Sequence, residues 1–203
     1  MEKVNVESGR MLESILESLS QMEYIKSSEI PNIDLYMDQV LTFMNQKLEW
    51  SKRYDDDKIM TKTMINNYAK NHLLPAPEKK KYSKEHLLVL LFIYYFKNIL
   101  SIGDIQSILG PLTERYFGEG KDLELEKIYE EVFSLEKGQI EQLKVTLAKD
   151  YERAGNTFTD VPEQDQEFLQ LFSFVCMLSY DIYMRKQIIE KIIDTMTKQT
   201  YKK

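Results

Sequence analysis

The chain has 203 residues, of which 43% are hydrophobic and 30% charged, and its net charge is −6. With 7 glycines and 5 prolines it favours helices over a turn-rich β fold, and its single cysteine, Cys176, excludes an intramolecular disulfide. The start MEKVNVESGR lacks the basic and apolar runs of a signal peptide, and the apolar segments 87–96 and 168–180 are shorter than the roughly 18 residues that span a membrane. We therefore expect a cytoplasmic protein with no membrane partner.

Helical periodicity runs through the first fifty residues. Apolar residues between Ser8 and Met22, at spacings of three and four, predict a short amphipathic helix. A second helix is expected after Pro31 and to about Trp50, with Asn32 or Asp34 as its N-cap. The charged sequence RYDDDK that follows is typical of a loop.

The next helix is predicted over 61–72, because Pro75 and Pro77 force the chain into an extended conformation. Ser83 is expected to cap a helix that is apolar on nearly every face through Phe96, which places this helix at the centre of a core. The only strand signal lies around the lysines that precede Tyr82.

Further along the chain, a brief helix is predicted over 102–109, ended by a Gly-Pro pair, and Gly118 to Gly120 is the predicted boundary between two halves. Apolar residues over 125–147 follow helical spacing with an interruption at Gly138, which favours a helical hairpin. After Pro162, one long or two shorter helices are expected to run to about Thr197.

The predicted helix 61–72 has two chemically different faces. Met64, Ile65, Tyr68 and Ala69 share one face, whereas Thr63, Asn66, Asn67 and Lys70 share the other. Amides, hydroxyls and ammonium groups bond base edges and phosphates in a major groove, and asparagine can make a bidentate pair with adenine. This pattern favours a helix that packs on one side and reads DNA on the other.

Basic charge is concentrated in the same region. Residues 58–86 contain seven lysines and two glutamates, so this segment carries +5 with histidine neutral, and the rest of the chain carries −11. Such segregation lets an acidic protein approach DNA with one surface. In an extended wing Lys80 and Tyr82 would share one face, and an inward Tyr82 would make Lys79 and Lys81 the exposed pair.

The segment TKTMINNYAKNHLLPAPEKKKYSKEHLLVLLFIYYFKNILSIGDIQSIL resembles the winged helix-turn-helix of the MerR regulators: a recognition helix ending in an aromatic residue, a leucine-proline turn, a basic wing closing on Tyr-Ser, a hydrophobic helix and a short helix after a serine. With EIPNIDLYMDQVLTFM, the layout is still more similar to the bacterial domain-of-unknown-function family 1836, which is regarded as MerR-like. The resemblance covers about 28–109.

This resemblance implies an all-α fold with at most a small β-wing. It implies a winged helix-turn-helix domain that binds double-stranded DNA (28–110). Apolar periodicity places an N-terminal amphipathic helix (1–27) before this domain and a helical region (121–203) after it, which we expect to dimerise or to bind an effector. The function implied is transcriptional regulation, with helix 61–72 in the major groove and the 78–82 wing on the backbone. The expected DNA contacts are Lys62, Thr63, Asn66, Asn67, Lys70, Lys79, Lys80, Lys81 and Tyr82.

The sequence departs from the MerR pattern at the recognition helix, where Asn66 replaces the usual arginine and Asn67 replaces an aromatic residue. A helical protein-interaction module that keeps the winged fold without DNA affinity is therefore the alternative interpretation. Salt-dependent binding to duplex DNA separates the two functions.

A homodimer is expected from the apolar pattern over 125–147 and from the two-fold symmetry of most operators. The apolar segment 168–184 is predicted to pack in the core, and a pocket for a small apolar effector is the alternative. The sequence contains no HExxH, CxxC, Gly-rich phosphate loop or nucleophile elbow, so we expect no enzyme, no metal site and no cofactor. His72 and His86 are interpreted as helix-terminal residues.

Overall fold

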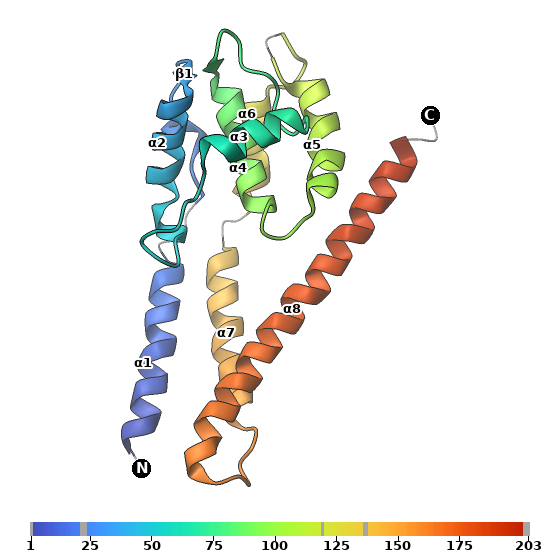
Figure 1. Ribbon diagram of the computed structural model, residues 1–203. Helices are drawn as coiled ribbons and strands as arrows, with labels where there is room; N and C mark the ends of the chain where they lie inside the picture. Colours follow the sequence, from blue (N-terminus) through green and yellow to red (C-terminus); the bar gives the residue numbers. More distant parts are fainter. Residues whose placement is uncertain (1, 21–23, 119, 136–137, 201–203) are drawn as a thin grey trace. The chain divides into compact units, whose positions relative to one another are not determined.

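The computed structural model describes residues 2–20, 24–118, 120–135 and 138–200, and within these ranges the chain is mainly helical, as expected (Figure 1). Two short strands form a single antiparallel sheet. No helix in these ranges is both long and apolar enough to cross a bilayer. The helices are α1 (Glu2–Leu19), α2 (Met37–Lys47), α3 (Lys62–Lys70), α4 (Lys84–Phe96), α5 (Ile102–Tyr116), α6 (Leu125–Ser134), α7 (Gln139–Gly155) and α8 (Glu163–Thr200), and the strands are β1 (Leu35–Tyr36) and β2 (Lys81–Tyr82).

The chain folds into two compact units, each assembled from two separate segments. The small unit combines Met1–Glu23 with Leu135–Ile188, and the large unit combines Tyr24–Ser134 with Ile189–Lys203. This division differs from the expected ranges 1–27, 28–110 and 121–203. The predicted first helix belongs to the small unit as α1, and residues 21–22 of that prediction lie outside the described part of the chain.

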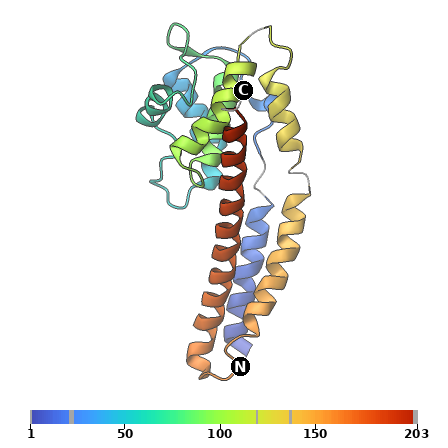
Figure 2. The ribbon, with the colours of Figure 1, turned by 90° about the vertical axis from the view of Figure 1, so that its right-hand side faces the viewer.

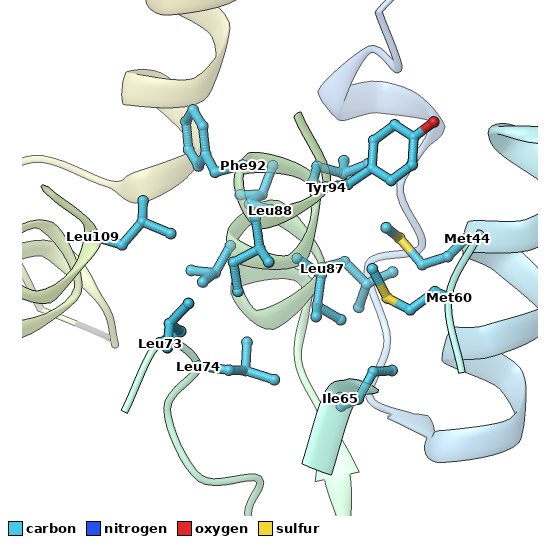
Figure 3. Close-up of a cluster of buried hydrophobic side chains, with 14 of the residues drawn as sticks. Met44, Met60, Ile65, Leu73, Leu74, Leu87, Leu88, Phe92, Tyr94 and Leu109 are labelled. Carbon is cyan, nitrogen blue, oxygen red and sulfur yellow. The ribbon is translucent and has the colours of Figure 1, made fainter. Parts of the chain in front are cut away.

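Helix α4 forms the centre of the large unit, as its sequence predicted. Nine of its thirteen residues are buried, because apolar side chains occupy nearly every face. Leu87, Leu88 and Phe92 project from α4 toward side chains of the surrounding elements (Figure 3). Each of these leucines contributes on the order of 2 kcal/mol through burial. The helix begins directly after its capping residue Ser83, as expected.

Residues 35–36 were expected to be helical, and this prediction was wrong. They form β1, which pairs with β2 so that Leu35 lies opposite Tyr82 and Tyr36 lies opposite Lys81. Leu35 and Tyr82 are both buried, so the pairing closes one edge of the core. Helix α2 consequently begins at Met37, with Tyr36 as its N-cap in place of the predicted Asn32 or Asp34.

The Gly-Pro pair at 110–111 was expected to end a brief helix, but α5 continues through it to Tyr116. Pro111 has no N–H group to donate, so one intrahelical bond is missing. Burial of Leu109 and Leu112 against the core favours the continued helix and offsets this loss.

The helical hairpin predicted over 125–147 is also corrected, because α6 and α7 belong to different units. Leu125, Tyr129 and Phe133 of α6 are buried in the core of the large unit. The Tyr129 hydroxyl donates a hydrogen bond to the carbonyl of Ile25 at 2.6 Å. The boundary between units therefore lies at Ser134, and Gly118 and Gly120 form a loop with positive φ.

The small unit packs α1, α7 and the first part of α8 side by side (Figure 2). Its buried residues are Leu147 and Ala154 of α7 and Phe174 of α8, with Leu16 and Leu19 of α1 half-buried against them. The prediction that 168–184 packs in a core holds for Phe174 but was wrong for most of its other large apolar residues, which are exposed.

Candidate nucleic-acid interface

Helix α3 is a short helix with well-defined ends. It begins after Thr61, whose hydroxyl accepts a hydrogen bond from the Met64 N–H at 3.2 Å. It ends at Lys70, two residues earlier than expected, because His72 adopts a positive φ of 57°. The Leu73 N–H then donates back to the Tyr68 carbonyl at 2.9 Å, which is the bonding of a Schellman motif. The helix is therefore held at both ends before the chain reaches Pro75.

The two faces of α3 lie as their spacing predicted. Ile65 is fully buried in the large-unit core, close to residues of α4 and to the Met60 side chain (Figure 3). Met64 and Tyr68 are half-buried beside it. The five expected contact residues on this helix are all exposed: Lys62, Thr63, Asn66, Asn67 and Lys70.

The first turn of α3 contains no acidic residue, and Lys62 occupies it. A cation near a helix N-terminus is unfavourable by a few tenths of a kcal/mol, because it opposes the helix dipole. The exposed start of this helix therefore carries unbalanced positive charge.

Lys79 and Lys80 form the two central positions of a tight turn. Their φ angles are 48° and 64°, and the Lys81 N–H donates to the Glu78 carbonyl at 2.8 Å across the turn. Both lysine side chains are exposed. The expectation of alternating faces in an extended wing was wrong, because two adjacent positive φ values place both lysines at the tip.

Lys81 and Tyr82 do not share this exposure. The Lys81 ammonium lies 5.5 Å from the centroid of the Tyr36 ring, across the β1–β2 pair, and the side chain is half-buried. The Tyr82 ring is 4% exposed, and burial raises the pKa of its hydroxyl. Tyr82 is thus a core residue, and we remove it from the expected DNA contacts. The exposed pair of lysines is Lys79 and Lys80, and not Lys79 and Lys81 as expected.

His86 links this sheet to the rest of the large unit. The Ser83 backbone N–H donates to its Nδ1 at 3.0 Å, and its ring packs edge-on against Tyr82 and Phe117 at centroid distances of 5.5 and 4.7 Å. Burial lowers the pKa of His86, which favours the neutral imidazole that accepts this bond. The side chain is a structural cap. Across the described residues, no group of His, Cys, Asp or Glu side chains is arranged to hold a metal ion.

The acidic loop predicted at 53–58 is organised by one of its own carboxylates. Asp57 accepts hydrogen bonds from the backbone N–H groups of Arg53 and Tyr54, both at 3.0 Å. This gives Asp57 a local structural role.

Tyr36 is the surface residue that sequence reasoning missed. It is exposed next to the half-buried Lys81 and its ring faces that ammonium group, so it holds the base of the lysine turn in place. Its strand is two residues long, which is too short to give a period-2 pattern.

The sequence matches the profile of a domain of unknown function, DUF1836, over residues 25–132. The chain belongs to this family. The matched segment is more than half of the chain and nearly coincides with the main segment of the large unit, Tyr24–Ser134. The DUF1836 match therefore includes most of α6, beyond the 28–109 range of the expected resemblance.

The other comparisons add no relatives. No curated protein matches this chain, and no solved structure matches it.

Proposed function

We propose that this DUF1836 protein is a DNA-binding transcriptional regulator with a MerR-like winged helix-turn-helix. Helix α3 enters the major groove, and the Lys79–Lys80 turn contacts the phosphate backbone. The observation that carries this proposal is the conformation of the two lysines, which occupy positions where asparagine and glycine are favoured.

A left-handed conformation costs an L-residue roughly 1 to 2 kcal/mol, and it occurs here at two adjacent lysines. Strained backbone in a surface turn is typical of functional sites. The strain brings two exposed ammonium groups to one tip, where neither is paired with a carboxylate in an ion pair of the described structure. A requirement for positive charge at this tip accounts for both features.

Helix α3 supplies the groups for base recognition. Asn66 and Asn67 are exposed and adjacent, and their amides can donate and accept at adenine N6 and N7. Thr63 and Lys70 flank them on the same face and suit phosphate or sugar contacts. Base discrimination is thus assigned to the asparagines and most of the counterion release to the lysines.

We further propose that the regulator acts as a homodimer, because a two-fold protein matches the two-fold symmetry of most operators. Of the α6 residues on which the sequence-based expectation rested, Leu125 is buried in the large unit, Ile128 is half-buried and Val132 is exposed. Val132 is the one large apolar residue of α6 that is exposed, so most of the interface between the two copies must lie elsewhere.

The test is binding of the purified full-length protein to duplex DNA from upstream of its own gene, titrated with salt. Binding should weaken linearly in log affinity against log salt, with a slope of about −0.9 for each phosphate contacted. A random duplex of equal length should bind more weakly with a similar slope. Absence of DNA binding at low salt would refute the proposal and favour the protein-interaction module.

A further inference from the structure

Helix α8 carries an exposed apolar stripe within the small unit. Phe168, Phe172, Val175 and Ile182 follow the spacing of a coiled-coil seam, with Ser179 at the intervening seam position. Each of the four apolar residues is at least 55% exposed, and Phe168 reaches 70%. The rings of Phe168 and Phe172 stack on one another at a centroid distance of 6.3 Å, so they form one continuous surface.

The opposite side of the same helix makes the contacts of the small unit. Phe174 is buried there, and Met177 and Leu178 are half-buried against α7 and α1. The core of the small unit thus contains none of the stripe residues. Exposed apolar surface of this extent is uncommon on a monomer and is typical of an interaction site.

The charges beside the stripe identify what covers it. Glu163, Asp165 and Glu167 precede it, no charged residue lies between 168 and 180, and the far end carries Asp181, Arg185 and Lys186. The first end of the stripe therefore carries three negative charges, and the far end carries a net charge of +1 because Asp181 offsets one of its two cations. An antiparallel second copy of the stripe would place each acidic first end beside the net positive far end of its partner, whereas a parallel copy would place like charges together.

The Arg185 side chain remains accessible in the single chain. Arg185 donates to Asp181 at 2.8 Å, and its side chain is 74% exposed. Its guanidinium has further N–H donors that can bond a second carboxylate.

We infer that a second copy of this chain covers the stripe, with the two α8 helices antiparallel and crossing near Val175. This inference does not depend on DNA binding. The stripe from 168 to 182 is about 21 Å long at a rise of 1.5 Å per residue, or two heptads, so we expect a reversible dimer whose population depends on concentration.

The first test compares two valines of the small unit with nearly equal exposure. Val175 lies in the stripe and is 57% exposed, and Val145 lies on α7 and is 56% exposed. Val175→Glu should raise the dimer dissociation constant at least about 100-fold in sedimentation equilibrium, because the symmetric interface would bury two carboxylates. Val145→Glu should leave it within about twofold, and circular dichroism should show that both variants keep their helical content.

A wild-type chain that stays monomeric at all concentrations would overturn the inference, and so would a dimer that Val175→Glu leaves intact. Equal loss of dimer in both variants would also overturn it, because the surface would then not be specific to α8.

The second test measures orientation in the full-length dimer. A nitroxide label at Gln164→Cys, with Cys176→Ser as background, should report two labels separated by about 33 Å along the helices in the antiparallel arrangement. A parallel in-register pair would hold them within about 10 Å along the interaxial direction, before the label linkers are added. A short distance in an intact dimer would refute the antiparallel assignment.

Discussion

The Lys79–Lys80 turn allows a substitution in which fold stability and DNA affinity should change in opposite directions. Lys79→Asn with Lys80→Gly supplies the residues that a two-residue turn with positive φ prefers. Each lysine bears a backbone cost of about 1 to 2 kcal/mol. Asparagine removes part of this cost and glycine removes all of it, but glycine adds back up to about 1 kcal/mol through the entropy of the unfolded chain.

The expected net effect is a rise of about 1 kcal/mol or more in the free energy of unfolding. Urea denaturation followed by circular dichroism should show a higher midpoint with an unchanged m-value. In the DNA titration, the same variant should bind cognate and random duplexes more weakly. Its plot of log affinity against log salt should flatten by about 0.9 for each lost phosphate contact, or about 1.8 for two.

The matched control replaces both lysines with arginine, which keeps the charge and the backbone cost. This variant should retain the wild-type salt slope and gain no stability. If the Asn-Gly variant binds DNA with the wild-type salt slope, the turn does not contact the DNA phosphates. The strained conformation of the two lysines then does not serve DNA binding. If the Asn-Gly variant is no more stable than the arginine variant, the assigned strain is absent.

Three further outcomes follow from the structure. Asn66→Ala or Asn67→Ala should lower discrimination between cognate and mutated sites by about 1 to 3 kcal/mol in competition binding and leave random-DNA affinity nearly unchanged; a full specificity ratio in both variants would exclude base reading by these amides. Burial lowers the pKa of His86 in the folded state, so its contribution to the free energy of unfolding is complete above the unfolded pKa of about 6.5. This contribution is lost as the pH falls toward the folded-state pKa, by up to about 1.4 kcal/mol per pH unit. Denaturation between pH 8 and 5 should therefore show a smaller loss of stability for His86→Gln than for wild type. Tyr129→Phe should cost about 1 to 3 kcal/mol in the same assay at neutral pH, since it leaves the buried carbonyl of Ile25 without its 2.6 Å bond; an unchanged midpoint would show that this bond is dispensable.

The parts of the fold that the sequence predicted are those fixed by local signals. Helix α4 combines a serine cap with an uninterrupted apolar run, and any packing that buries it produces the same helix. The outward face of α3 was predictable because a single buried residue, Ile65, fixes which side of a nine-residue helix faces the core.

The features that were missed depend on contacts between distant segments. Strand β1 exists because Leu35 and Tyr82 bury each other across 47 positions of sequence, and two residues carry no period of their own. Apolar spacing in α6 correctly predicted a helix, but spacing does not identify its partners, which are α4 and the segment around Ile25. Two lysines with positive φ are unpredictable from propensity, because the turn opposes their intrinsic preference.

Helix α8 has a consequence for biosynthesis, because it contributes residues to both units. Ile189 and Ile193 of α8 pack into the same core as residues of 24–134, and residues 163–188 complete the small unit begun by α1. On the ribosome, the small unit cannot complete its packing until synthesis has passed Ile188, and the large unit cannot do so until synthesis has passed Ile193, although Tyr24–Ser134 emerges some sixty residues earlier. During that interval the core of the large unit lacks the buried Ile193 and the half-buried Ile189, so the apolar side chains that these two residues cover stay exposed on the nascent chain.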